Sequence, residues 1–155
     1  MTKREELLQA VASGNIEEIN RLCTVSAEEE KEVVGDLLSI RDDEGRSLVH
    51  VAARERQVNA VRVLAELGAD LRAADHQGIT PLDSAAASGL VEAIEVLVES
   101  GADVTTVDND GLTPVHAAAL KGQVDAIRLL AESGADVNAV MNGGATPVFL
   151  AAQEG

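Results

Sequence analysis

The sequence predicts an all-α repeat solenoid, a stack of short helix-turn-helix units joined by β-hairpin-like turns. The first observation is a period, because Gly45, Gly78, Gly111 and Gly144 follow one another at intervals of 33 residues. The second is composition: 46% of the 155 residues are hydrophobic but only 1% are aromatic, and Phe149 is the single case. Aliphatic side chains of similar size suit many small, equal layers better than one large core.

The same period recurs at other positions and fixes the register of the units. Hydroxyl residues, aliphatic residues and alanine pairs repeat in step: Ser47, Thr80, Thr113 and Thr146, then Val49, Leu82, Val115 and Val148, then Ala52-Ala53, Ala85-Ala86, Ala118-Ala119 and Ala151-Ala152. Chance does not keep one register four times. We therefore divide a single domain, 1–155, into a capping repeat at 5–41, full units at 42–74, 75–107 and 108–140, and a shortened unit at 141–155.

The unit at 75–107 shows how each first helix is expected to begin and end. Gly78 permits a turn, Thr80 can cap the free amide groups, and Pro81 suits the first helical position. Gly89 is expected to end this helix. The first helix of the unit is therefore predicted to start at Pro81 and to stop before Gly89.

A second helix is predicted from about Val91 to Ser100, and Gly101 follows as its stop signal. Its apolar and acidic residues separate onto two faces: Val91, Ile94, Leu97 and Val98 on one, Glu92, Glu95 and Glu99 on the other. Helices this short are marginal alone in water. They persist only if each unit buries its apolar face against the next, so stacking is obligatory.

The N-terminal residues follow the same plan more loosely. Gly14 matches Gly89, and Arg56 stands at that place in the next unit, 42 residues further on rather than 33. About nine extra residues lie between them, and we place this acidic insert near 24–33, as an extended helix or a loop. The segment has the polar character of a solenoid cap. A functional use of the insert is the alternative.

Arg56 is expected to carry a strained backbone, because the matching glycines imply a positive φ. An Arg56→Gly substitution is then expected to stabilise the fold by about 1 kcal/mol, partly offset by greater entropy of the unfolded chain.

The segment 141–155 supplies a turn and a first helix from Pro147 and then stops. We expect Val148, Phe149 and Leu150 to lack the layer that covers their counterparts, and the chain to have been cut from a longer array or to be covered there by another chain. Met141 also replaces the turn aspartate, which weakens this unit. Fraying from about Asn142 and self-association through this end are expected.

The segments Gly78-Ile79-Thr80-Pro81-Leu82 and Gly111-Leu112-Thr113-Pro114-Val115-His116-Ala117-Ala118 resemble the ankyrin repeat, and so does Gly134-Ala135-Asp136-Val137-Asn138-Ala139. The resemblance covers roughly residues 42–155, and its period, turn residues and helix pattern agree. It implies L-shaped units with a concave face that binds another protein.

Charge and cysteine content narrow the classes of partner. Twelve basic against twenty-seven acidic residues leave a net charge of −15, which disfavours nucleic acid and anionic membranes and slightly favours a cationic partner. A single Cys23 excludes an internal disulfide and fits a reducing compartment, the cytoplasm or the nucleus. Neither a signal peptide nor an apolar stretch of membrane-spanning length is present in the sequence.

No metal, cofactor or catalytic site is predicted. Asp108 to Gly111 looks like part of a calcium loop, but Thr106 and Ala117 fall where acidic ligands are needed. His50 and His116 stand two units apart, which is too far for a shared metal. They resemble the ankyrin family's structural histidine, which hydrogen-bonds backbone at the helix start, whereas Asp83 replaces it in the middle repeat and leaves the bonding there open.

The sequence also lacks a nucleophile elbow, a phosphate loop, an H-E-x-x-H motif and a cysteine cluster, so we expect no enzyme activity. His76 lies on a turn tip, where it is either solvated surface or a pH-sensitive contact.

Positions that vary among the units mark the candidate partner-binding face, because stacking positions recur. The candidates are Asp43, Glu44, Arg46, Arg54, Glu55, His76, Gln77, Ile79, Ser88, Asn109, Asp110, Leu112, Leu120, Lys121 and Asn142. Ile79, Leu112 and Leu120 are apolar where exposure is expected, so they are either a hot spot with a polar rim or scattered surface residues. The function is then that of an adaptor or scaffold, or of a dedicated inhibitor or regulatory subunit of an enzyme.

Overall fold

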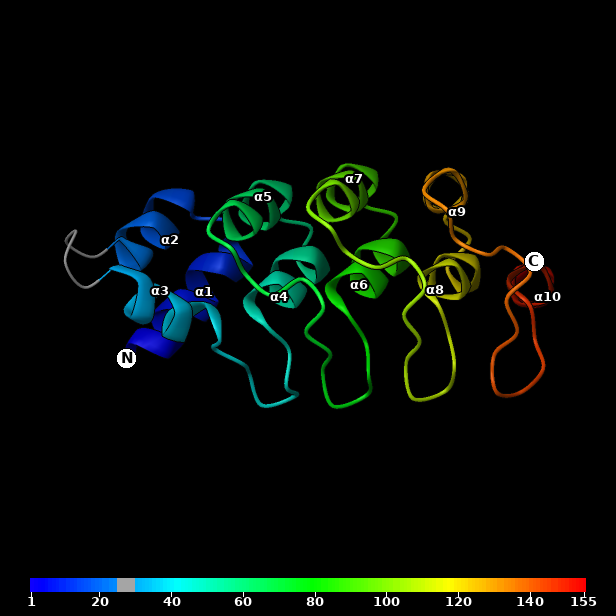
Figure 1. Ribbon diagram of the computed structural model, residues 1–155, viewed down its shortest axis with the longest axis horizontal. Helices are drawn as coiled ribbons and strands as arrows, with labels where there is room; N and C mark the ends of the chain where they lie inside the picture. Colours follow the sequence, from blue (N-terminus) through cyan, green and yellow to red (C-terminus); the bar gives the residue numbers. More distant parts are fainter. Residues whose placement is uncertain (25–29) are drawn as a thin grey trace.

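The computed structural model describes residues 1–24 and 30–155, and its helices form two parallel rows (Figure 1). The inner row contains α1 (Lys3–Ser13), α4 (Leu48–Arg54), α6 (Pro81–Ser88), α8 (Pro114–Leu120) and α10 (Pro147–Glu154). The outer row contains α2 (Ile16–Cys23), α5 (Val58–Glu66), α7 (Val91–Glu99) and α9 (Val124–Glu132). Long turns project from the inner row, so the predicted all-α solenoid is confirmed.

The N-terminal repeat holds one helix more than the others. Helix α3 (Glu30–Leu38) follows α2 and precedes the first long turn. It contains the C-terminal part of the predicted insert at 24–33, while residues 25–29 lie outside the described part of the chain. The guanidinium of Arg4 donates to the carbonyl oxygen of Arg41 from Nε at 3.0 Å and from Nη2 at 2.8 Å, which ties α1 to the first long turn.

The predicted helix starts are confirmed by the capping geometry. The Thr80 hydroxyl accepts from the Asp83 amide, the Asp83 carboxylate accepts from the Thr80 amide, and Pro81 opens α6. Ser47 and Thr113 cap α4 and α8 in the same reciprocal way, with a histidine in place of the aspartate. Each inner helix therefore begins where a hydroxyl residue satisfies its first amide groups.

The predicted positive φ at Arg56 is also confirmed. Its φ is 61°, beside 68° at Gly14, 64° at Gly89 and 65° at Gly122. Arg56 is the only non-glycine residue with a positive φ in the described part of the chain. A side chain with a Cβ thus occupies a left-handed backbone that the other repeats give to glycine.

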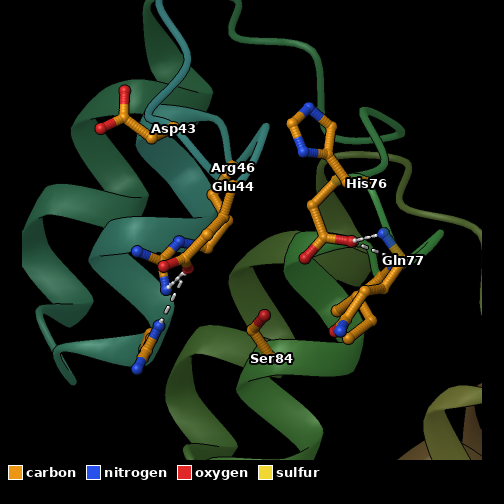
Figure 2. A pocket seen from close by; sticks show the side chains of 9 residues that line it. Asp43, Glu44, Arg46, His76, Gln77 and Ser84 are labelled. Carbon is orange, nitrogen blue, oxygen red and sulfur yellow. Dashed lines mark hydrogen bonds and ion pairs between the residues drawn. The ribbon is translucent and has the colours of Figure 1, made fainter.

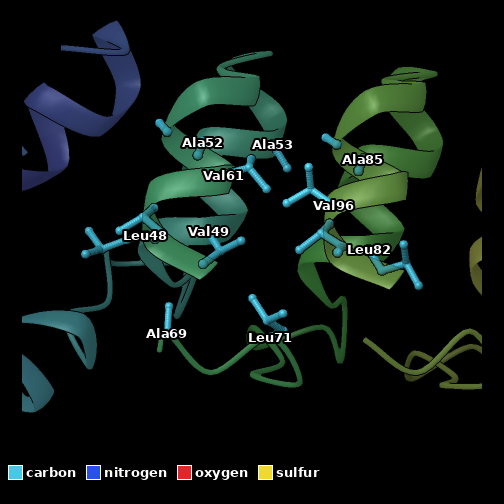
Figure 3. Close-up of a cluster of buried hydrophobic side chains, with 14 of the residues drawn as sticks. Leu48, Val49, Ala52, Ala53, Val61, Ala69, Leu71, Leu82, Ala85 and Val96 are labelled. Atoms are coloured by element: carbon cyan, nitrogen blue, oxygen red, sulfur yellow. The ribbon is translucent and has the colours of Figure 1, made fainter. Parts of the chain in front are cut away.

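The core is a continuous band of small aliphatic side chains between the rows. Leu48, Ala52 and Ala53 of α4 are fully buried, as is Val61 of α5. Figure 3 shows these residues beside Leu82, Ala85 and Val96 of the next repeat, and Ala69 and Leu71 close the core near the turns. Alanine pairs let neighbouring inner helices approach closely, which explains why the layers carry so little aromatic volume.

The turns are linked to one another as well as to the helices. Within a turn, the Asp75 carboxylate accepts from the amides of Gln77 and Ile79 at 2.8 and 3.0 Å. Between turns, the Asn109 amide donates to the carbonyl oxygen of Gln77 at 3.0 Å, and the same bond is made one repeat earlier and one later. The projecting turns therefore form a hydrogen-bonded ladder along the stack. No helix in the described residues is both long enough and apolar enough to cross a membrane.

The last unit is only partly covered. Val148 and Phe149 of α10 are 70% and 52% exposed, whereas the equivalent Val115 and His116 are fully buried. Leu150 was expected to lack cover as well, and this was wrong, because it is 7% exposed. Its side chain belongs to the face of α10 that packs on α8.

Candidate binding groove

Two adjoining hollows lie between the turns and the inner helices. The first has a volume of about 360 Å³ and lies between the turns of the second and third units. Figure 2 shows Glu44 and Arg46 on one side, His76 and Gln77 on the other, and Ser84 on the α6 helix below. This hollow is walled mainly by polar and charged side chains.

An ion-pair network holds one wall of the first hollow in place. The Glu44 carboxylate lies 2.6 Å from Arg46 Nη1 and 3.6 Å from Arg54 Nη1. Arg46 Nε also donates to Asp42 at 2.6 Å. The pKa of Asp42 is lowered, because the hydrogen bonds and charge of Arg46 outweigh the opposing effect of burial, which is the largest single influence. The two arginines are thus partly neutralised from within the protein.

The second hollow is the apolar one. It has a volume of about 320 Å³ and lies between α6, α8 and the turns before them. Ile79, Leu112 and Leu120 come from two different turns and a helix, yet all three line this hollow, together with Ala87 and Ala117. Arg54 and Lys121 also line it, and Ser84 and Ser88 lie along α6. Side chains that are far apart in the sequence therefore create one apolar surface with a polar edge.

The three apolar residues are half-buried rather than exposed. The part of each side chain that stays accessible therefore belongs to a residue that lines the hollow. This arrangement differs from scattered surface hydrophobics, because the residues share one concavity.

Two buried histidines support the turns that form these walls. The Ser47 amide donates to His50 Nδ1 at 3.1 Å, so Nε2 carries the proton and donates to the carbonyl oxygen of Ile79 at 2.7 Å. His116 makes the equivalent pair of bonds with Thr113 and with the next turn. Burial lowers the pKa of His50, which favours this neutral form. Their structural role at the helix start is confirmed, and each histidine also joins two repeats.

Asp83 stands at the histidine position of the third repeat and lines the second hollow. Its Oδ2 accepts from the amide and the hydroxyl of Thr80, both at 2.8 Å. Its Oδ1 is buried and has no hydrogen-bond partner in the part of the chain that the structure describes. Burial raises the pKa of Asp83 to about 6, against the opposing effect of the Thr80 hydrogen bonds.

The described residues contain no candidate metal site, because no three His, Cys, Asp or Glu side chains lie close enough together to hold an ion.

A family model described as "Ankyrin repeats (3 copies)" matches residues 7–108 and 105–155. The chain belongs to the ankyrin-repeat family. No curated protein is significantly similar to it. Ankyrin repeats are generally protein–protein interaction modules and typically not enzymes.

Most of the binding residues expected for this ankyrin domain line the two hollows. The first is lined by Asp43, Glu44, Arg46, Arg54, His76, Gln77 and Ile79, and the second by Arg54, Ile79, Ser88, Leu112, Leu120 and Lys121. Four expected residues line neither hollow: Glu55, Asn109, Asp110 and Asn142. His76 is exposed, as expected for a turn tip.

Asn109 and Asn142 have a structural role in the ankyrin turns. Their side-chain amides donate to the carbonyl oxygens of His76 and Asn109, at 3.2 and 3.3 Å. Each bond connects a turn to the turn before it, so these asparagines stabilise the ladder.

Sequence reasoning missed Asp83 and Ser84 as groove residues. A signal for them was present, because Ser84 precedes Ser88 by one helical turn and so shares its face. Asp83 was interpreted only as a replacement for the structural histidine at the helix start, so no role in the groove was expected of it.

Proposed function

We propose that this ankyrin domain binds a partner protein along the groove formed by the two hollows. The observation that carries the proposal is the convergence of Ile79, Leu112 and Leu120 on one concavity of about 320 Å³. An apolar centre with a polar edge is the usual anatomy of a binding hot spot. Arg54 belongs to both hollows, so one extended partner segment would contact the polar and the apolar part together.

The partner that suits the groove presents an aliphatic or aromatic side chain to the second hollow and basic groups around it. The net charge of −15 supports the basic component and disfavours nucleic acid and anionic membranes. Within the groove, Asp75 and Asp108 form no ion pair in the described part of the chain, whereas Asp43 is paired with Arg4 of α1 at 3.2 Å. Arg46 is instead committed to Asp42 and Glu44.

Two roles are compatible with such a groove. The first is an adaptor or scaffold, and we favour it because a shallow, open surface accommodates more than one partner. The second is a dedicated inhibitor or regulatory subunit that covers an enzyme's surface. Affinity capture separates them, since several unrelated partners support the adaptor, and one enzyme that loses activity supports the inhibitor.

Three further parts of the proposal concern the setting. We propose that the domain has no catalytic activity of its own and that it acts in the cytoplasm or the nucleus, where the unpaired Cys23 would stay reduced. We also propose weak self-association through the exposed Val148 and Phe149 of α10. Sedimentation at rising concentration, with Phe149→Ser as the variant, tests that last part.

The main experiment replaces the apolar centre and leaves the stack intact. The double variant Ile79→Ser and Leu112→Ser is expected to weaken a captured partner by roughly a hundredfold, at about 1–2 kcal/mol for each hot-spot side chain. Glu92→Gln and Glu95→Gln provide the control, because both residues are exposed on α7 in the outer row. Circular dichroism checks that the helical signal is unchanged. A larger loss from the outer pair than from the groove pair would show that the partner binds elsewhere.

A further inference from the structure

The repeats before and after that of Asp83 each use a histidine to make a hydrogen bond to the next repeat, and Asp83 stands where that histidine would be. His50 Nε2 donates to the carbonyl oxygen of Ile79, and His116 makes the same type of bond to the following turn. The residue 33 positions after Ile79 is Leu112. The carbonyl group of Leu112 is therefore the acceptor that the stack offers to position 83.

The Asp83 carboxyl group reproduces half of the histidine arrangement. Its Oδ2 takes the place of Nδ1, because it accepts from the Thr80 amide just as Nδ1 of His50 accepts from the Ser47 amide. By the same correspondence, Oδ1 is the atom that is left for the place of Nε2, and it is buried without a hydrogen-bond partner among the described residues. The residue as a whole is only 5% exposed. An ionised oxygen in that place can only accept, whereas a backbone carbonyl opposite it has no proton to donate.

The charges around Asp83 favour its protonated form. Burial is the largest cause of its raised pKa, and the carboxylates of Asp108 and Asp75, in the turns on either side, raise it further. The other titratable or charged groups on the elements packed against α6 are His50 and Arg54 on α4, His116 on α8 and Lys121 directly after it, and Glu92, Glu95 and Glu99 on α7. None of these forms an ion pair with Asp83 in the described residues.

We infer that Asp83 is a proton-binding joint between the third and fourth repeats, whose protonated Oδ1 donates a hydrogen bond to the carbonyl oxygen of Leu112. The carboxylate takes up one proton from solvent, and no other bond is made or broken. Because a carboxyl group ends one atom earlier than an imidazole, the Leu112 turn moves toward α6 when this bond forms. Leu112 and Asp83 both line the second hollow, so acidification would also reshape the groove, a consequence that rests on the proposed function.

The sign of the effect on stability follows from the folded and unfolded pKa values. The folded pKa of Asp83 is about 6 and the ordinary pKa of an exposed aspartate is 3.8. The folded state therefore holds the proton of Asp83 more tightly than the unfolded state does. The contribution of this group to stability grows as the pH falls through 6 and stops growing below 3.8. From about pH 7.5 to about pH 4.5, this group is expected to lower the unfolding equilibrium constant by about thirtyfold.

An Asp83→Asn variant isolates the joint, because its amide is uncharged and can donate at every pH. The unfolding constant of the wild type is expected to fall about thirtyfold relative to that of Asp83→Asn between those two pH values. Glu92→Gln is the matched control, a carboxylate-to-amide change at an exposed site of α7, and it should show no such change. A ratio of wild type to Asp83→Asn that does not vary with pH overturns the inference.

A second measurement tests the bond itself, by carbon-detected nuclear magnetic resonance of the folded protein. The side-chain carboxyl carbon of Asp83 and the backbone carbonyl carbon of Leu112 are expected to titrate together with a midpoint near the Asp83 pKa of about 6. In Asp83→Asn, the Leu112 signal should no longer titrate at that midpoint. A Leu112 carbonyl that is insensitive to pH in the wild type would overturn the inference. Neither experiment uses a partner, so a failure here leaves the proposed function intact.

Discussion

The left-handed backbone at Arg56 allows a test that separates strain from side-chain contacts. Its φ of 61° lies in the region that costs a residue with a Cβ about 1–2 kcal/mol. Arg56→Gly removes that cost but adds about 0.4–1 kcal/mol of unfolded-state entropy. Arg56→Ala keeps the strain and removes the same long side chain. We therefore expect the glycine variant to be more stable than the alanine variant by about 1 kcal/mol.

The difference in stability between Arg56→Gly and the wild type is expected to be smaller, because the wild-type Arg56 side chain makes a stabilising contact. The guanidinium donates to the carbonyl oxygen of Ser88, the last residue of α6. Carbonyl groups at a helix C-terminus lack intrahelical partners and favour a nearby cation, at about 0.3–1 kcal/mol for an exposed group. The gain of about 1 kcal/mol expected from the sequence is then reduced, and Arg56→Gly is expected to exceed the wild type by about 0.5 kcal/mol.

Thermal and urea unfolding of the three proteins, followed by circular dichroism, measures both differences. For a chain of this length, 1 kcal/mol corresponds to about 2–4 °C in Tm. The order expected is glycine, wild type, alanine. If Arg56→Ala matched or exceeded Arg56→Gly, the left-handed backbone would carry no strain in this repeat and the reasoning would be refuted.

Three other predictions follow from the joints between repeats. Gly89→Ala should destabilise the fold by about 1 kcal/mol in urea unfolding, because alanine is strained at the φ of 64° and its Cβ would displace the Gln123 side chain; an unchanged midpoint would contradict it. Burial lowers the pKa of His50, so its contribution to stability is present above the ordinary histidine pKa of 6.5 and is lost as the pH falls; a His50→Asn variant should lack that loss. Amide exchange should be faster at Val148–Ala152 than at Val115–Ala119, and equal protection in a monomer would show a finished cap.

The repeat chemistry could be predicted from the sequence because it is local. Thr80, Pro81 and Gly89 act within a few residues of the helix that they begin or end, so their spacing fixed the bounds of α6. The positive φ at Arg56 was accessible for a related reason. Alignment of the repeats placed it where glycine stands in the others, and backbone conformation follows position in a solenoid.

The groove could be predicted only in part, because it depends on contacts between repeats. Ile79, Leu112 and Leu120 were identifiable as apolar residues at variable positions, but their meeting in one hollow depends on the rise and rotation of the stack. Asn109 was assigned to the binding surface because it varies, yet its side chain holds the preceding turn. Variation along a repeat protein thus indicates either a partner or an unusual neighbour, and the sequence does not distinguish the two.

Two departures from the repeat pattern, at positions 56 and 90, occur at places that contact each other in the other repeats. Gly14 and Gly89 are followed one repeat later by Gln57 and Gln123, whose side chains occupy the space that a Cβ would need. Where Arg56 replaces the glycine, Leu90 replaces the glutamine. A Leu90→Gln substitution should therefore be more harmful in the wild type than in the Arg56→Gly background, since only the latter leaves room for the amide.

A double-mutant cycle on Arg56 and Leu90 measures this dependence directly. Residues in contact commonly show interaction energies of about 0.5–3 kcal/mol, whereas independent sites add within about 0.5 kcal/mol. Gln123 shows what the restored pair would gain, because its side-chain amide donates to the carbonyl oxygen of Ala87 at 3.3 Å across the boundary. With glycine at position 56, the side-chain amide introduced by Leu90→Gln should make the same interaction with α4. Strict additivity in the cycle would mean that the residues at positions 56 and 90 do not interact across the boundary between their repeats. The pairing of Arg56 with Leu90 would then have no structural cause.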